Sequence, residues 1–548
     1  MIDKNTIKKV IDSLSFVILK GEISEDNAII NFHVETLTEE GGGTLDWRVC
    51  IEPSYPYKVG GRETIHFFNT SLLEYPHIMR SGFLCLHTPN MDNPEQQLTV
   101  DLARLKEWID KYYVRKEKDE HYEELVVGRR EIDGIYYNFY YTETDKAFPK
   151  NDYGTVDLVS LMPGIHDGKR IKTYIANVFQ SNNTKEQYCC QWKENYQGNT
   201  LFEGIYCFLD KAPSLYDKFV LEQYSNMSTL FSWSQMAFLA KRAKEKSIAP
   251  RIPLFCGYYI PNGEVRWQVA MLKTGAFPIK SEKVRCGGRP FMNYSFKKEL
   301  IDWAYPYNCS YIRFFGRGAM PFSLAEKKIF IIGIGAIGSI VATTLTRCGA
   351  KFLDYYDIDL KEPGNICRSD YDFLSGVSNK SHELYSILHS ISPFVHCEIP
   401  NSFLDFGIKK SGDDDKIRDT IMKVLNRYDI IFDCSTDDGL MNALENLNLK
   451  PKIINLSISN HAKELVCAFC GNIADTIKFM YNSIINSDQI DMFYPTGCWS
   501  PTFKASYNDV ASKVQLALKY IIKMLTHEEP ESNFYISENK DGLHINRV

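Results

Sequence analysis

The sequence has no long uninterrupted apolar run. Its longest apolar stretch, residues 329–345, contains three glycines, a pattern typical of a strand, a loop and a helix and not of a membrane span. The first residues, MIDKNTIKKVIDSL, lack the apolar core and the small-residue cleavage site of a secretory signal. No repeat or low-complexity tract is present. We therefore expect a folded cytoplasmic protein that does not cross a membrane.

The chain also lacks an excess of positive charge. Lys and Arg number 63 against 69 Asp and Glu, which gives a net charge of -6 and no basic field of the kind that binds phosphate backbones. This balance argues against a nucleic-acid partner. The 15 cysteines show no framework spacing, so we expect reduced thiols, of which one or two are nucleophiles.

The length of 548 residues exceeds what one hydrophobic core usually serves and predicts two to four domains. Residues 1–120 open with a helix-compatible stretch followed by short strand-like runs, which predicts a small α+β domain. Residues 121–320 mix strand-rich pieces with a helical stretch around 227–246, so we expect a mixed α/β middle domain, without a functional assignment. Residues 321–548 alternate buried strands with helices and predict an α/β, Rossmann-like domain.

A glycine motif opens that last domain. Gly333, Gly335 and Gly338 form GxGxxG directly after the strand-like run IFII, where glycines allow a tight turn and let backbone N–H groups approach phosphates. Asp357 closes the next predicted strand, where its carboxylate can accept the hydroxyls of a ribose. This much suits NAD as well as ATP.

Charged residues further along the chain favour ATP over NAD. Arg368 and Lys380 can neutralise a triphosphate, and Asp433 or Asp437, at a strand end, can hold Mg²⁺. A dehydrogenase does not need this set, whereas phosphate chemistry does. Taken singly, each of these charges is more often part of a surface ion pair.

Four segments that contain these residues resemble the adenylation domain of ubiquitin-activating enzymes and of their bacterial ThiF/MoeB-type relatives. The segments are GIGAIGS, DYYDIDLKEPGNICRSDY, GVSNK and FDCSTDD. In that family an Asn follows the ribose-binding Asp by eight positions and an Arg follows it by eleven, as Asn365 and Arg368 follow Asp357. The resemblance implies ATP and Mg²⁺ as cofactors. It also implies that Asp357 binds the ribose, that Asn365, Arg368 and Lys380 bind the phosphates, and that Arg368 and Asp437 are catalytic, with Asp437 also a ligand of Mg²⁺.

Two further segments contain candidate nucleophiles. Cys498, in PTGCWSPTF, precedes a helix-compatible stretch, 506–525, and a helix N-terminus favours the thiolate. Its position beyond the last predicted nucleotide-binding strands resembles that of the catalytic cysteine of activating enzymes. Cys467 and Cys470 compete for this role; they form a CxxC pair, but a zinc site of that kind needs a second pair, which the sequence lacks.

Cys85 lies in YPHIMRSGFLCLHTPN, which resembles the active-site segment of ubiquitin-conjugating enzymes. In that family a His-Pro-Asn tripeptide precedes Gly-x-Ile-Cys-Leu by a fixed spacing, and Tyr75-Pro76-His77 stands in the same register here. The resemblance implies a ubiquitin-conjugating-like domain in which Cys85 carries an acyl group. His77 occupies the place of the Asn, so the way in which an amine attacks must differ from the standard enzymes.

The order of these parts resembles the fused ubiquitin-transfer proteins of bacterial CBASS anti-phage operons. The resemblance implies that ATP adenylates the C-terminal carboxylate of a partner, that Cys498 captures it as a thioester, and that Cys85 accepts it before an amine attacks. The implied partners are a CD-NTase as the activated protein, a target protein or small amine as the acceptor, and a deconjugating peptidase from the operon. It also implies a homodimer. The sequence leaves open whether Arg313 or Arg317 is an arginine finger that reaches the nucleotide of a partner subunit.

Three alternatives remain open at this point. A small ubiquitin-like protein could replace the CD-NTase as the activated partner. The chain could be a nucleotide-binding scaffold without turnover, in which the cysteines are structural. The glycine motif and Asp357 would also suit an NAD-dependent oxidoreductase.

Overall fold

The computed structural model forms two compact units, one of residues 1–190 and 198–308 and the other of residues 191–197 and 309–548. The first unit contains two main sheets that share no strand. The division into three domains at 1–120, 121–320 and 321–548 stays a prediction. The structure describes residues 2–38, 42–79, 81–117, 131–196, 202–213, 222–245, 249–260, 263–286, 289–398, 404–484, 492–493, 502 and 504–548.

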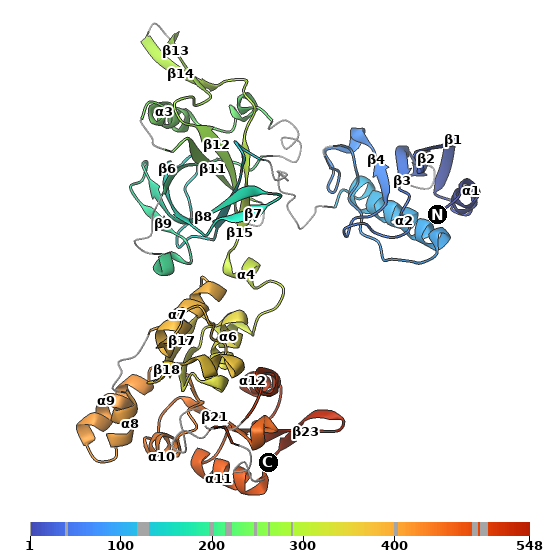
Figure 1. The fold of residues 1–548 in the computed structure, drawn as a ribbon. Coiled ribbons are helices and arrows are strands. Elements are labelled where there is room, and N and C mark those ends of the chain that lie inside the picture. The colour runs from blue at the N-terminus through green and yellow to red at the C-terminus, as the bar shows by residue number, and fades with distance from the viewer. Residues whose placement is uncertain are drawn as a thin grey trace. The chain divides into compact units, whose positions relative to one another are not determined.

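The N-terminal part of the first unit is a helix, a four-stranded antiparallel meander and a second helix (Figure 1). Alternate side chains of β3 are buried against this second helix, as expected for a sheet with one covered face. The predicted helix and meander are confirmed, whereas the first strand was not predicted, because its apolar residues do not alternate. The elements are α1 (Lys4–Asp12), β1 (Val17–Asp26), β2 (Ile29–Leu37), β3 (Thr44–Ile51), β4 (Ile65–Phe68), η1 (Thr70–Leu72), α2 (Pro94–Trp108) and the π-helical turn η2 (Ile109–Val114).

The remainder of the first unit is built on a seven-stranded barrel, which closes because β5 pairs with both β15 and β8. Stacked aromatic rings fill its core, among them Phe148, Phe179 and Trp267. The barrel strands are β5 (Ile135–Tyr141), β6 (Tyr153–Ser160), β8 (Lys169–Ser181), β10 (Phe202–Phe208), β11 (Arg251–Tyr259), β12 (Val265–Lys273) and β15 (Trp303–Asn308).

Other elements decorate the barrel. Strands β7 (Gly164–His166) and β9 (Gln187–Cys189) pair with β8, and β13 (Ile279–Cys286) and β14 (Arg289–Phe296) form a separate ribbon. Helix α3 (Trp233–Arg242) packs on this ribbon. The predicted helical stretch around 227–246 is confirmed as α3, but the region is β-rich and not mixed α/β, since α3 is the one α-helix in the part of 131–308 that the structure describes. A closed barrel depends on pairings between distant strands, which a local pattern does not show. A short 3₁₀ turn, η5 (Tyr224–Met227), completes this part, whereas the turn η3 (Lys193–Tyr196) lies in the segment 191–197 of the second unit.

The second unit contains a seven-stranded sheet in the order β17-β16-β20-β21-β22-β23-β24. The first four strands are parallel and the last three are antiparallel to their neighbours. The predicted Rossmann-like α/β arrangement is therefore confirmed. Its strands are β16 (Lys328–Ile332), β17 (Phe352–Tyr356), β20 (Ile430–Asp433), β21 (Lys452–Ser459), β22 (Glu464–Ala468), β23 (Phe534–Asn539) and β24 (Gly542–Arg547), with β18 (Leu360–Lys361) and β19 (Ser378–Asn379) as a small separate pair.

Helices cover both faces of this sheet (Figure 1). Phe330 and Ile332 point toward α8 (Leu404–Lys410), α9 (Asp415–Leu425) and α10 (Asp438–Asn446). Because successive side chains of a strand alternate, Ile331 points to the opposite face and meets α6. There α6 (Ala336–Arg347) lies beside α7 (Lys380–Ile391) and α12 (Tyr507–Leu525), while α11 (Ile473–Ile484) joins α10. Short helical turns complete the unit: α4 (Tyr311–Phe314), α5 (Phe322–Ala325), η6 (Pro363–Arg368) and η7 (Asn460–Ala462).

None of the helices within the described ranges is both apolar enough and long enough to span a bilayer.

Candidate nucleotide site and candidate nucleophiles

The loop between β16 and α6 is made of glycines for steric reasons. Gly333 has a φ of +79°, and a Cβ there would lie 2.6 Å from the Cα of Ser435. A Cβ on Gly338 would lie 2.0 Å from the carbonyl oxygen of Gly333. Gly335 differs, because a Cβ there would meet no atom within 4 Å. The open side of the loop thus lies at Gly335, where an outside group can approach the backbone.

Two side chains hold the peptide of Ile334 in this loop. The backbone N–H of Ile334 donates to Asp357 Oδ2 at 2.9 Å, and the hydroxyl of Tyr371 donates to the Ile334 carbonyl at 2.7 Å. Asp357 Oδ1 also accepts from the N–H of Asp359 at 2.8 Å. Tyr371 belongs to the segment that carried the family resemblance, but sequence reasoning did not single it out. The loop is therefore clamped from both sides of one peptide group.

Lys380 brings positive charge to the same place. It is the first residue of α7, and its Nζ lies 3.0 Å from Asp359 Oδ2 and 3.6 Å from Asp357 Oδ1. Its side chain is 7% exposed, whereas that of Asp359 is 66% exposed. A bound phosphate would therefore compete with the exposed carboxylate of Asp359 for a cation that is already in position.

Asn365 and Arg368 lie on the turn η6. The Asn365 Oδ1 accepts from the N–H of Glu362 at 2.8 Å and so caps this turn. Arg368 Nη1 donates to Thr502 Oγ1 at 2.9 Å. This turn begins at Pro363, whose missing N–H is tolerated at the first position of a helix. The local sequence thus places both predicted phosphate-binding side chains on one short element.

These residues meet in a cavity of about 440 Å³. It lies where the parallel strands β16, β17 and β20 end, the edge at which open α/β sheets bind ligands. All the residues predicted for the nucleotide line it except Gly338, which supports the loop from behind. The predicted residues on its wall are Gly333, Gly335, Asp357, Asn365, Arg368 and Lys380, and the other lining residues include Asp359, Ser369, Tyr371, Ser435, Thr436, Ile458 and Thr502.

The cavity fits ATP in size and in chemistry. Open backbone at Gly335 and two cations, Arg368 and Lys380, suit a phosphate chain, and Asp357 is the carboxylate next to them. Because parallel sheets of this kind also bind NAD, the paired cations are the feature that favours ATP over a dinucleotide.

Asp437, predicted to be catalytic and to bind Mg²⁺, is not among the residues that line this cavity. Its carboxylate caps α10 through the N–H of Leu440 at 3.0 Å and lies 2.6 Å from Lys409 Nζ. Partial burial raises the pKa of Asp437, but the hydrogen bonds from Lys409 and Leu440 outweigh it and leave the pKa below its ordinary value. Binding a metal ion would require Lys409 to release this carboxylate.

Asp433, the other candidate for Mg²⁺, is buried at the end of β20. It accepts hydrogen bonds from Ser435 Oγ at 2.7 Å and from Asn455 Nδ2 at 2.9 Å. Burial raises its pKa. Within the described ranges no group of three or more His, Cys, Asp or Glu side chains is arranged to hold a metal ion. The Mg²⁺ site remains a prediction.

Cys85 lies in the loop after β4, close to two histidines. Its N–H donates to the carbonyl of His77 at 2.8 Å. The His77 ring turns to Tyr112, with 3.3 Å between Nε2 and the tyrosine hydroxyl. The thiol Sγ lies 4.0 Å from Nε2 of His87, a residue that sequence reasoning missed. Its only sequence signal was a position two residues after the cysteine.

Five predicted residues remain. One of them, Cys498, lies outside the described residues. Cys467 is fully buried on β22, and burial raises its pKa well above the ordinary value, whereas Cys470 is half-buried. Arg313, on α4, and Arg317, after it, are both exposed.

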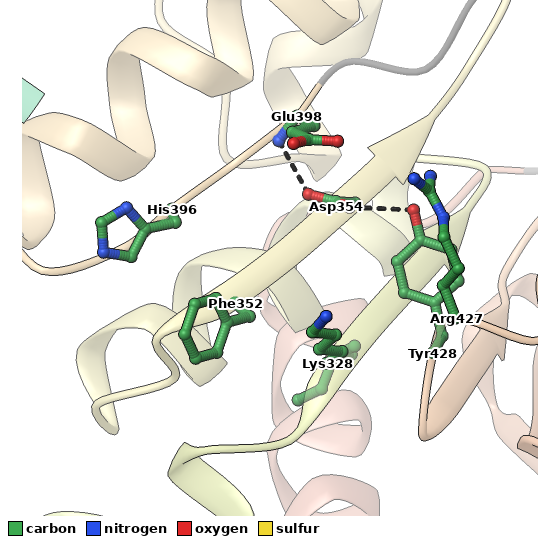
Figure 2. Close-up of a pocket in the computed structure, with 8 residues that line it drawn as sticks. Lys328, Phe352, Asp354, His396, Glu398, Arg427 and Tyr428 are labelled. Atoms are coloured by element: carbon green, nitrogen blue, oxygen red, sulfur yellow. Dashed lines mark hydrogen bonds between the residues drawn. The ribbon is translucent and has the colours of Figure 1, made fainter. Parts of the chain in front are cut away.

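A second cavity of about 290 Å³ lies at the opposite edge of the parallel sheet (Figure 2). Figure 2 shows Asp354 at its centre, accepting hydrogen bonds from the N–H of Glu398 and from the hydroxyl of Tyr428. The rings of His396 and Phe352 stack at 5.6 Å on another side. This cavity has no glycine loop and faces the amino ends of the strands, where such sheets do not bind nucleotides. We assign no ligand to it.

The comparison with known proteins finds similarity in the part of the chain that forms the first cavity. Residues 312–444 match the model of the ThiF family. The chain is 27% identical over 237 residues to the ATP-dependent ubiquitin transferase-like protein Cap2 of Enterobacter hormaechei, an alignment that covers 42% of this chain and 38% of the relative. It is 33% identical over 78 residues to ubiquitin-like modifier-activating enzyme 5 of Caenorhabditis elegans, covering 14% of this chain and 19% of the relative.

Among solved structures, the chain is similar to MccB of E. coli with ATP, at 19% identity and a TM-score of 0.29, over 41% of this chain and 64% of that one. The matches thus span less than two thirds of the length of each of these relatives. The family match, together with the glycine loop and its cavity, lies in the second unit. Residues 312–444 of this unit are therefore similar to the ThiF family, and the chain is similar in sequence to a ubiquitin-like modifier-activating enzyme.

Proposed function

We propose that this protein uses ATP to activate the C-terminal carboxylate of a partner protein and passes the acyl group through Cys498 and Cys85 to an amine. The observation that carries the first step is the single cavity in which an open glycine loop, Asp357, Arg368 and Lys380 meet. The similarity of this chain to proteins named as ubiquitin transferase-like and as activating enzymes supports the later transfer steps of the proposal.

In the adenylation step a carboxylate oxygen of the partner attacks the α-phosphorus of ATP, and the bond to pyrophosphate breaks. The backbone of the glycine loop, Arg368 and Lys380 would bear the negative charge that moves onto the leaving pyrophosphate. Asp357, clamped to Ile334 and Asp359, would orient the ribose through the lone pairs that those N–H groups leave unused. Mg²⁺, when bound, would neutralise further phosphate charge, and Asp437 is its predicted ligand.

In the relay, the thiolate of Cys498 attacks the acyl carbon and AMP leaves. The thiolate of Cys85 then attacks the thioester, and the sulfur of Cys498 leaves. Each covalent intermediate divides one difficult acylation into easier steps. The N-terminal arrangement of a helix, an antiparallel meander and a second helix around Cys85 supports a ubiquitin-conjugating-like role for this part.

We infer that the activated partner is a CD-NTase, joined to a target protein or small amine in anti-phage defence, with a deconjugating peptidase encoded beside it. This assignment rests on the resemblance to fused transfer proteins of CBASS operons and on the similarity to Cap2. A ubiquitin-like protein is the alternative partner. A neighbouring gene for a nucleotidyltransferase supports the first, and one for a ubiquitin-like protein supports the second.

The relay requires the two thiols to meet, either by a domain motion or between the protomers of a homodimer. We propose the homodimer, formed through the adenylation domain, because relatives of that domain pair in this way. Arg313 or Arg317 would then be able to reach the nucleotide of the partner protomer.

The direct test of the adenylation step is ATP–pyrophosphate exchange with the purified chain and each candidate partner. Exchange should appear only with the true partner and should fall at least about tenfold in Lys380→Met, because that substitution removes a cation from the cavity wall. Binding of ATP without exchange would support a scaffold, and binding of a nicotinamide nucleotide would support an oxidoreductase. Either result contradicts the proposal.

A further inference from the structure

The proposed nucleophile Cys85 has a histidine ring, that of His87, next to its sulfur. Their Sγ and Nε2 atoms lie 4.0 Å apart. His87 is exposed and Cys85 is half-buried, so an acyl group on the sulfur and an incoming amine can both approach the imidazole. A base within this reach of a reacting atom can collect a proton directly or after a small rotation of its ring.

The chain on the amino side of this pair is fixed by backbone hydrogen bonds. The N–H of Leu84 donates to the carbonyl of Phe67 in β4 at 2.8 Å. The N–H of Cys85 donates to the carbonyl of His77 at 2.8 Å. The sulfur is therefore held at the edge of the antiparallel sheet.

On the carboxyl side every polar group of Thr88 is engaged. Its N–H donates to Glu63 Oε1 at 3.1 Å, its hydroxyl donates to Asp101 Oδ1 at 2.8 Å, and its carbonyl accepts from Lys58 Nζ at 2.9 Å. Asp101 is itself buried on α2 and accepts from the hydroxyl of Tyr55 at 2.8 Å. The residue next to His87 is thus anchored to the core, although the imidazole itself is in solvent.

The other nearby histidine has a different contact. The ring of His77 lies 5.2 Å from the ring of Tyr112, with its Nε2 near the tyrosine hydroxyl. Of these two histidines, His87 is the one whose ring is seen in contact with the sulfur, at 4.0 Å.

We propose that His87 is the catalytic base of the ligation step at Cys85; this rests on the proposed function of Cys85 as an acyl carrier. The amine nitrogen attacks the thioester carbon, and a positively charged nitrogen results. Nε2 of His87 takes the proton from that nitrogen, and the Cys85 sulfur leaves as a thiolate, so that an amide forms. Histidine suits this role because it titrates nearest to neutral pH among the ordinary side chains.

The test uses the full-length chain with Cys498→Ala and a small acyl donor, the mercaptoethanesulfonate thioester of acetyl-glycyl-glycine, which requires neither ATP nor the partner. Loading of Cys85 is established by peptide mapping, and the donor is then removed. The loaded protein is chased with lysine or with hydroxylamine, whose attacking nitrogen gives up its proton to water more readily. The discharge rate is followed by intact mass in wild-type His87, in His87→Gln and in His33→Gln, an exposed histidine on β2.

The proposal predicts that His87→Gln slows discharge to lysine by on the order of 100-fold and discharge to hydroxylamine by less than about threefold. Added imidazole should restore discharge to lysine in His87→Gly, and His33→Gln should behave as wild type. Equal lysine rates in wild type and His87→Gln, or an equal loss with both nucleophiles, would overturn the proposal. Failure of Cys85 to load at all would instead overturn the proposed function of this cysteine.

Discussion

At the scale of single residues, the glycines of the β16–α6 loop serve different purposes. Gly338 is required by packing inside the chain, since a Cβ there would meet the Gly333 carbonyl oxygen at 2.0 Å. Gly335 is required by nothing inside the chain, as no atom lies within 4 Å of its Cβ position. If phosphates occupy that space, the two positions must respond differently to the same added methyl group.

We therefore predict that Gly338→Ala lowers both stability and ATP affinity, the former by about 1–3 kcal/mol because backbone must shift. Gly335→Ala should leave the free energy of unfolding within about 0.5 kcal/mol of wild type, yet weaken ATP binding at least about tenfold. Urea unfolding and isothermal titration with ATP measure the two quantities. Unchanged ATP affinity in Gly335→Ala would show that phosphates do not approach this loop.

Asp437 gives a second prediction at this scale. In Asp437→Asn the cap of α10 persists, since Asn caps helices as well as Asp, while the ion pair with Lys409 is lost. The pair is partly exposed, so the free energy of unfolding at pH 7 should fall by less than about 1 kcal/mol. ATP–pyrophosphate exchange should fall at least about tenfold if Asp437 binds Mg²⁺, and excess Mg²⁺ should restore part of it.

The pH dependence of this variant follows from the lowered pKa of Asp437. A carboxyl group with a lowered pKa stabilises the folded state above its ordinary pKa, and this stabilisation disappears as the pH falls through the folded-state value. The difference in urea midpoint between wild type and Asp437→Asn should therefore shrink from pH 7 toward pH 3. A difference that grows on acidification contradicts the ion pair.

At the scale of elements, the segment between β17 and α7 carries three of the predicted nucleotide contacts: Asp357, Asn365 and Arg368. It is held by an ion pair between Lys361, in β18, and Glu383, in α7, whose side chains are 0% and 5% exposed. Burial raises the pKa of Glu383, but hydrogen bonds from Lys361 and Ser378 outweigh it and lower the pKa below the ordinary 4.5. Lys361 also donates to the carbonyl of Asp372 at 2.8 Å, which fastens the middle of the segment.

We predict that Lys361→Met lowers the free energy of unfolding by about 3–5 kcal/mol, because it leaves a buried carboxylate without its partner. The double variant Lys361→Met with Glu383→Leu should recover most of this loss. In wild type the pair stabilises the fold above pH 4.5 and less at lower pH, so the gap between wild type and Lys361→Met should narrow on acidification. A double variant no more stable than the single one would show that the pair does not act as a unit.

The element scale also shows what the sequence alone could predict. The βαβ unit with its glycine loop was predicted because strand, turn and helix are adjacent in the chain, and α12 was predicted as the helix-compatible stretch 506–525. The barrel was not, because its closure depends on the pairing of β5 with β8, strands whose partners no local pattern specifies. Strand β1 was missed because its apolar residues do not alternate, which agrees with the exposure of most of its side chains.

Some site residues could likewise be predicted from the sequence, and others could not. Asp357, Asn365, Arg368 and Lys380 were found because family spacing is a property of the sequence, and the cavity brings them together. Tyr371 and His87 were missed, since their contacts with Ile334 and with Cys85 are created only by the folded chain. The capping role of Asp437 and its pair with Lys409 were likewise not visible, because Lys409 lies on a different helix.

At the scale of the whole molecule, the two units have separate cores. A ligand that binds one of them stabilises it by mass action, by about 2.7 kcal/mol at a hundred times its dissociation constant. We predict that calorimetry resolves more than one unfolding transition and that a non-hydrolysable ATP analogue raises only one of them. Gly338→Ala should lower that same transition. An analogue that shifts every transition equally would indicate that the units unfold as one.

The acyl relay from Cys498 to Cys85 can be tested by one experiment. The chain is co-expressed with the neighbouring operon genes as wild type, Cys85→Ala and Cys498→Ala, and partner adducts are identified on gels with and without reducing agent and by mass spectrometry. We expect a reducible adduct on Cys498 in Cys85→Ala and no adduct on either thiol in Cys498→Ala. Adducts like those of wild type in both variants would contradict the relay.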